Sequence, residues 1–164
     1  MLDSKGYAHN FFSFTQDFNG DGRLDLLVIG FPGRDSRWFE NRNGAAGHWP
    51  VHQAMAQTDN ESPSVQDLTD DSKPEIICQV NGVLGYASPN PDKPTEPFVW
   101  HAIYPEGALG GKFTHGLGVG DVKGGRAEWR CGVHCERSER CWRGRRCATF
   151  VTVCDQAGRT LSAT

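Results

Sequence analysis

Residues 17–25 read Asp-Phe-Asn-Gly-Asp-Gly-Arg-Leu-Asp and lead directly into an apolar run that ends at Gly30. Oxygen-bearing side chains stand at the first, third, fifth and ninth positions of this loop: Asp17, Asn19, Asp21 and Asp25. Gly22 is at the sixth position, where a calcium loop turns sharply, and the main-chain carbonyl of Arg23 comes next, at the seventh. Ca2+ takes about six to eight hard oxygen ligands, and carboxylates this close together repel one another without a cation. The stretch therefore predicts a Ca2+ site.

The loop differs from an EF-hand in the residues on its C-terminal side. An EF-hand needs a bidentate Glu at the twelfth position and a helix on each side, whereas the twelfth position here is Val28. The apolar run around Val28 is short, partly β-branched and closed by Gly30-Phe31-Pro32-Gly33. These features predict a buried strand. We expect the metal loop to lead straight into a β-strand.

A second loop of the same kind begins 50 residues later, at Asp67. Ser72 replaces the turn glycine and Pro74 stiffens the chain, so we expect weaker Ca2+ binding there, or a metal-free turn held by Asp side chains. A third loop, at 120–126, lacks the central Asp, and we expect it to be empty. The candidate ligands of the second loop are Asp67, Thr69, Asp71, the carbonyl of Lys73 and Glu75.

The spacing of these loops indicates a repeat of about fifty residues, and a Trp-Pro-Val-His segment at 49–52 recurs as Phe-Val-Trp-His at 98–101. Each repeat contains a set of short strand patterns, as a propeller blade does. The strands are expected near 11–14, 24–29, 37–40 and 49–54, then near 63–66, 75–79, 83–87 and 98–103. The predicted fold class is all-β, a partial β-propeller of about two and a half four-stranded blades with an irregular C-terminal tail. The predicted propeller domain covers 1–124, with repeats near 11–60, 61–110 and 111–124.

These motifs resemble the FG-GAP/VCBS repeat family over about residues 10–127. The Asp-x-Asn-x-Asp-Gly-x-x-Asp loop entering a strand carries the likeness, with Trp-Phe-Glu-Asn at 38–41 and Trp-x-x-His at 49–52 in support. Such repeats build the seven-bladed propellers of integrin α-chain heads and of many bacterial extracellular proteins. The resemblance implies Ca2+ on the first loop and a Ca2+-stabilised module for ligand binding or adhesion, in an extracellular or periplasmic location. Residues 1–6 show no signal peptide.

Two other functions stay open: a carbohydrate-binding propeller, which exposed paired aromatics on a blade face would favour, and a non-catalytic platform for an enzyme domain missing from this chain. We do not expect an enzyme, because the sequence has no Gly-x-Ser-x-Gly, His-Glu-x-x-His or phosphate-binding glycine loop. The expected partners are an unidentified protein or carbohydrate ligand and neighbouring blades missing from this chain, with no nucleic acid. No stretch approaches the roughly 18 apolar residues of a membrane span. The residues expected to pack the blades are His52, His101, Trp38, Trp49, Trp100 and, as a buried thiol, Cys78.

The C-terminal segment 125–164 departs from the repeat. Residues 123–164 have a net charge of +5 and hold five of the six cysteines, whereas residues 1–122 have a net charge of −8. An Arg-rich arm for nucleic acid or a membrane surface is one interpretation. A zinc site is another, although its spacing lacks a Cys-x2-Cys knuckle. We favour a third, a shifted reading frame that leaves the tail without a selected structure, because the codons for Gly-Gly-Arg-Ala-Glu-Trp-Arg-Cys-Gly, read one base later, can spell Gly-Asp-Gly-Arg-Asn-Gly-Asp-Val-Val. The zinc candidates are Cys131, His134, Cys135, Cys141, Cys147 and Cys154.

Overall fold

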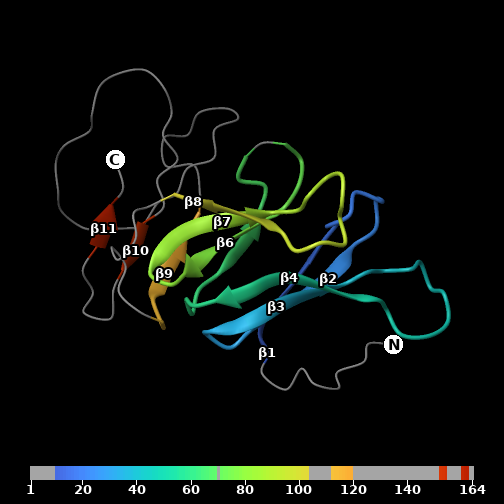
Figure 1. The fold of residues 1–164 in the computed structure, drawn as a ribbon, viewed down its shortest axis with the longest axis horizontal. Helices are drawn as coiled ribbons and strands as arrows, with labels where there is room; N and C mark the ends of the chain where they lie inside the picture. The colour runs from blue at the N-terminus through green and yellow to red at the C-terminus, as the bar shows by residue number, and fades with distance from the viewer. Residues whose placement is uncertain (1–9, 70, 104–111, 120–151, 155–159, 163–164) are drawn as a thin grey trace.

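The computed structural model describes residues 10–69, 71–103, 112–119, 152–154 and 160–162. Within these ranges the chain is all-β and contains no helix (Figure 1). It follows that no helix of this part is long and apolar enough to cross a membrane. The strands form two four-stranded antiparallel sheets and a smaller third sheet.

The first sheet is an antiparallel meander in which each strand pairs with the next along the chain. Its strands are β1 (Asn10–Gln16), β2 (Asp25–Gly30), β3 (Arg34–Phe39) and β4 (Val51–Thr58). The second sheet repeats the order with β5 (Ser64–Gln66), β6 (Glu75–Val80), β7 (Val83–Ser88) and β8 (Val99–Ala102). All eight predicted strands are confirmed, and two meanders of this kind are consistent with two propeller blades.

The third sheet is built from short strands in the order β11-β10-β9. These are β9 (His115–Gly118), β10 (Thr152–Cys154) and β11 (Thr160–Ser162). The tail therefore contributes two three-residue strands that the sequence did not predict. The predicted third loop at 120–126 and the zinc candidates before residue 152 lie outside the described residues.

The main core lies between the two four-stranded sheets. Leu27 and Ile29 of β2 and Trp38 of β3 belong to the same buried cluster as Ile76 and Cys78 of β6. Burial strongly raises the pKa of the Cys78 thiol, and its sulfur lies 3.7 Å from that of Met55 in the first sheet. The predicted buried thiol is confirmed.

The two sheets contribute opposite faces to this core. Positions 27 and 29 of the first repeat point into it, but at the 50-residue offset their equivalents are 77 and 79, whereas the second repeat uses 76 and 78. Side chains alternate between the two faces of a strand. The face of the second sheet that lies in the core is therefore equivalent, by sequence position, to the face of the first sheet that points away from it. Val28 and Phe39, on the remaining face of the first sheet, form a separate cluster with Leu26 and Trp49.

The connection from β4 to β5 ties the first sheet to the second. The main-chain N–H of Asp59 donates to the carbonyl of Gln79 at 2.9 Å, and the side-chain oxygen of Asn60 accepts the N–H of Gln79 at 3.1 Å. The Asp59 carboxylate also accepts the N–H of Asn81, in the turn between β6 and β7, at 2.6 Å. Phe113, just before β9, donates its N–H to the Asp59 carbonyl at 2.9 Å. One buried residue thus joins three segments of the chain.

Candidate metal centre in two equivalent loops

The two predicted metal loops share one hydrogen-bonded framework. In the first loop, Asp17 Oδ2 accepts the N–H of Gly22 at 2.7 Å; in the second, Asp67 Oδ2 accepts the N–H of Ser72 at 2.9 Å. The other oxygen of each aspartate accepts the N–H of the fifth loop residue, at 3.1 Å in the first loop and 3.2 Å in the second. The first aspartate therefore fixes the path of its own loop in both repeats.

The sixth position turns in the left-handed region in both loops. Gly22 has φ +81° and Ser72 has φ +66°. A Cβ added to Gly22 would meet nothing within 4 Å, so at this atom only the backbone conformation disfavours a side chain. The second loop keeps the turn of the first even though serine replaces glycine.

The ninth position carries a buried carboxylate at the start of the next strand. Asp25 opens β2 and Glu75 opens β6, and neither is exposed to solvent. Asp25 accepts the N–H of Phe18 at 3.1 Å, and Glu75 accepts the N–H of Leu68 at 2.6 Å. Burial raises the pKa of both carboxyl groups, and nearby aspartates of the same loop raise it further. A cation in either loop would favour the ionised form that burial disfavours.

The second loop brings its carboxylates together. Ligand oxygens of Asp67, Asp71 and Glu75 lie within 4.8 Å of one another. Two oxygens on one Ca2+ stand at most about 5 Å apart, because each lies roughly 2.3–2.6 Å from the ion. The three carboxylates are therefore close enough together to hold one metal ion. Glu75 also accepts the Thr69 hydroxyl at 3.1 Å, which places this predicted ligand beside the cluster.

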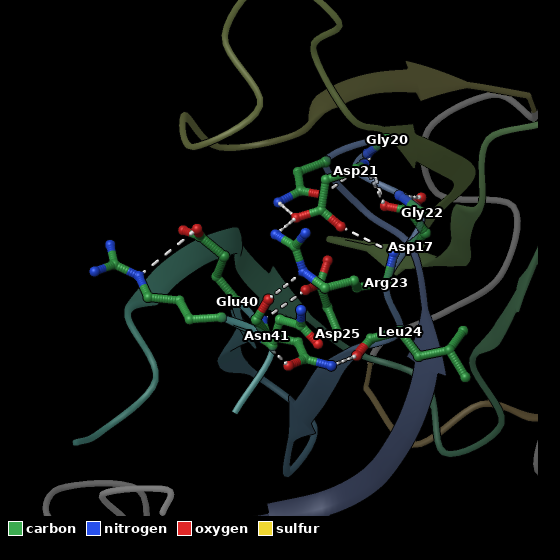
Figure 2. A network of polar contacts seen from close by, with 12 residues as sticks. Asp17, Gly20, Asp21, Gly22, Arg23, Leu24, Asp25, Glu40 and Asn41 are labelled. Atoms are coloured by element: carbon green, nitrogen blue, oxygen red, sulfur yellow. Dashed lines mark hydrogen bonds and ion pairs between the residues drawn. The ribbon is translucent and has the colours of Figure 1, made fainter. Parts of the chain in front are cut away.

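The first loop directs its carboxylates elsewhere, as Figure 2 shows. Asp25 uses its second oxygen to accept the N–H of Asn41 at 2.8 Å, and Asp21 forms an ion pair with the guanidinium of Arg23. The amide of Asn19 also donates to Asp21, at 3.0 Å. In the described part of the chain, only the second loop brings three carboxylates within 4.8 Å of one another.

Side-chain length explains the difference at the ninth position. Glu75 has one more methylene than Asp25, so it reaches the backbone N–H of Leu68 and still approaches the other carboxylates of its loop. Asp25 is one methylene shorter and is held between two backbone N–H groups, those of Phe18 and Asn41. The predicted carbonyl ligands, from Arg23 and Lys73, stay predictions.

Asn41 contacts the first loop from outside it, and the ligand pattern in the sequence did not indicate this contact. Its N–H donates to Asp25, its side-chain amide donates to the carbonyl of Leu24 at 3.0 Å, and its own carbonyl accepts from Arg23 at 2.8 Å. It lies just after β3, 16 residues beyond Asp25. Its place in the Trp-Phe-Glu-Asn motif at 38–41 was the only sequence signal.

The recurring histidines pack on aromatic rings, as the sequence predicts. His52 of β4 lies against Trp38, with ring centroids 4.5 Å apart, and His101 of β8 stacks on Tyr86 at 4.7 Å. Each histidine also has a polar partner: Glu40, just after β3, lies 3.0 Å from His52, and Ser88, at the end of β7, lies 3.1 Å from His101. The tryptophans also pack as expected: Trp38 is fully buried, whereas Trp49 and Trp100 are partly buried against the clusters.

The comparison with protein families agrees with this geometry. Residues 17–78 match the FG-GAP-like repeat. The match begins at the first aspartate of the first loop and ends within β6, so it includes both loops, all of β2 and the first part of β6. No curated protein and no solved structure gives a significant match. Residues 17–78 of this chain are an FG-GAP-like repeat.

Proposed function

We propose that this chain is a Ca2+-stabilised binding module whose blades present a surface for an extracellular or periplasmic ligand. The observation that carries the proposal is the convergence of Asp67, Asp71 and Glu75 within 4.8 Å, inside an FG-GAP-like repeat. The family resemblance supports the binding or adhesion role and the location.

The chemistry of the cluster favours Ca2+ over other divalent ions. All three side chains offer carboxylate oxygens, with no thiolate or imidazole that would favour zinc or copper. Mg2+ demands a near-ideal octahedron, whereas Ca2+ accepts irregular sets of carboxylate, carbonyl and hydroxyl oxygens, which are the ligand types predicted for this loop. The ion would neutralise Glu75, which is buried with a raised pKa, and so stabilise the start of β6.

A binding role needs no catalytic group, and we propose that the chain is not an enzyme. The two histidines at equivalent positions are engaged with aromatic rings and polar neighbours inside the sheets. Recurrence of one arrangement in two blades fits a structural role better than a unique active site.

The proposal is tested by calorimetric Ca2+ titration of the full chain, with thermal unfolding followed in Ca2+ and in chelator. We expect saturable binding and a higher melting temperature in Ca2+. Asp67→Asn should weaken binding strongly. Asp92→Asn, which removes an exposed aspartate from the loop before β8, should leave it unchanged. A folded chain whose melting temperature does not respond to Ca2+ would remove the metal from the proposal.

A carbohydrate ligand is favoured by one observation. Phe11 and Phe31 are 39% and 42% exposed, and their ring centroids lie 5.4 Å apart. Exposed aromatic faces can stack on sugars, but the two rings stand nearly perpendicular, at 81°. Binding to a glycan array that is lost in Phe31→Ala, with Ca2+ binding retained, would identify the ligand class as carbohydrate.

A further inference from the structure

Arg23 binds the Asp21 carboxylate, which is one of the ligands that Ca2+ would need in the first loop. Its guanidinium forms an ion pair with Asp21, the fifth loop position, and its Nε donates to the carbonyl of Asn41 at 2.8 Å (Figure 2). The Arg23 side chain is 37% exposed and that of Asp21 is 23% exposed. The arginine is therefore held at two points of its guanidinium group, and both contacts lie at the metal loop.

The second loop offers the natural comparison, because Lys73 stands where Arg23 stands in the first. Among the described ion pairs, Lys73 forms none with Asp71. A lysine carries a compact charge on a flexible stem, whereas the planar fork of arginine bonds a carboxylate and a second acceptor together. The loop with the lysine is also the loop whose carboxylates converge.

We propose that Arg23 is a built-in counter-cation of the first loop, which Ca2+ must displace from Asp21 before it binds there. The proposal rests on the proposed Ca2+ function. The Asp21 carboxylate cannot bind both the Arg23 guanidinium and a metal ion as strongly as it binds either alone. The two positive charges also repel each other at this range. Arg23 therefore lowers the Ca2+ affinity of the loop whose sequence is the better match. The second loop fills first as the Ca2+ concentration rises.

The test uses the full chain carrying Glu75→Gln, so that Ca2+ titration reports the first loop. Arg23→Met keeps the length of the side chain but removes its charge and donors. Arg42→Met is the matched control, because it removes the same charge from the adjoining segment, where the Arg42 Nε lies 3.8 Å from Glu40. We expect Arg23→Met to bind Ca2+ about fivefold more tightly, and Arg42→Met to change the affinity by less than about twofold.

A second measurement separates this role from a merely structural one. In chelator, Arg23→Met should lower the melting temperature, because it loses the contacts to Asp21 and Asn41. Affinity and metal-free stability should thus move in opposite directions. An affinity that stays equal, or falls together with the melting temperature, overturns the counter-cation role while the Ca2+ function stands. If neither the parent chain nor any variant binds Ca2+, both proposals fall.

Discussion

The first loop matches the calcium-loop pattern position by position, and the second departs from it at the turn, yet the carboxylates converge only in the second. In both loops the first aspartate accepts the N–H of the sixth residue, and that sixth residue turns in the left-handed region. They differ in the reach of the ninth side chain and in the groups that contact the other carboxylates. Asn41 and Arg23 engage the carboxylates of the first loop, whereas Glu75 extends to meet those of the second. A loop pattern specifies ligand types, and the surrounding contacts decide where the ligand atoms stand.

Removing the ninth-position carboxylate from each loop tests the contrast between the loops most directly. In chelator, we expect Asp25→Ala and Glu75→Ala each to lower the free energy of unfolding by about 3 kcal/mol, because buried and part-buried donors lose their acceptors. These donors are two N–H groups at Asp25, and two N–H groups with one hydroxyl at Glu75. Urea unfolding measures the loss, with Asp92→Ala as the control. A loss below about 1 kcal/mol for both variants would show that the carboxylates do not hold the loops.

Replacing each ninth-position carboxylate by its neutral amide then separates two roles of the side chain: holding the loop through hydrogen bonds and binding the metal. Glu75→Gln keeps a carbonyl oxygen for Leu68 and can turn its amide toward the Thr69 hydroxyl, so metal-free stability should change little. In Ca2+ at about a hundredfold excess over Kd, the wild type should gain roughly 2.7 kcal/mol, and Glu75→Gln should lose most of that gain.

The paired variant Asp25→Asn should behave differently. Its amide nitrogen cannot accept, so one of the N–H groups from Phe18 and Asn41 loses its partner, and metal-free stability should fall by about 1–2 kcal/mol. Thermal unfolding with and without Ca2+ compares the two variants. Equal behaviour in chelator would remove the distinction drawn between the ninth positions.

The pH dependence of the metal-free protein gives a smaller effect. Burial raises the folded-state pKa of Asp25 and Glu75 above the ordinary values of 3.8 and 4.5. Below those values both states are protonated and the full stability contribution is present. As the pH rises, the unfolded chain loses the protons first, so this contribution declines until the folded-state pKa is passed, by at most about 1.4 kcal/mol per pH unit for each group.

Glu75→Gln isolates this effect, because glutamine does not titrate. Above pH 4.5 in chelator, the stability of the wild type should fall relative to that of Glu75→Gln. Unfolding curves across pH 4 to 7 measure the difference. A wild type that instead gains stability over the variant as the pH rises would mean that the folded state favours the ionised glutamate without a metal.

The smallest effect should come from exchanging the turn residues. Gly22→Ser forces a non-glycine residue to φ near +81°, and we expect a loss of about 1 kcal/mol. Ser72→Gly relieves the same strain but loosens the unfolded chain, so we expect a gain of about 0.5 kcal/mol or less. Chemical unfolding of both variants in chelator tests the sign. Two losses of equal size would mean that the loops do not share one turn.

The sequence predicted the strands well because local patterns determine them. The run into β2 is apolar and ends in turn residues, and its repeat 50 residues later predicted β6 in the same way. The buried Cys78 was predicted from its place in an expected strand, and the packing of His52 was predicted from its recurrence beside aromatic residues in the second repeat. These features depend on neighbours along the chain or on the periodicity of the repeat.

The arrangement of the site was harder to predict because it depends on distant contacts. Asn41 reaches Asp25 only when β3 lies beside β2, and nothing in the spacing of the loop indicates that contact. The sequence also could not show that the extra methylene of Glu75 would offset the loss of the turn glycine. The pairing of β10 with β9 joins segments more than thirty residues apart, and no repeat pattern marks it.

The two four-stranded sheets meet through faces that are not equivalent in the repeat, and this gives the repeat a direction. Because Leu27 and Ile76 come from non-equivalent positions, the junction is not self-complementary, and a further copy of the unit would extend the series in one sense only. Tandem duplication of the coding segment would therefore create a compatible junction at once, with no new pair of surfaces to evolve. Such a protein can grow by whole units because alternate positions of each strand face opposite neighbours.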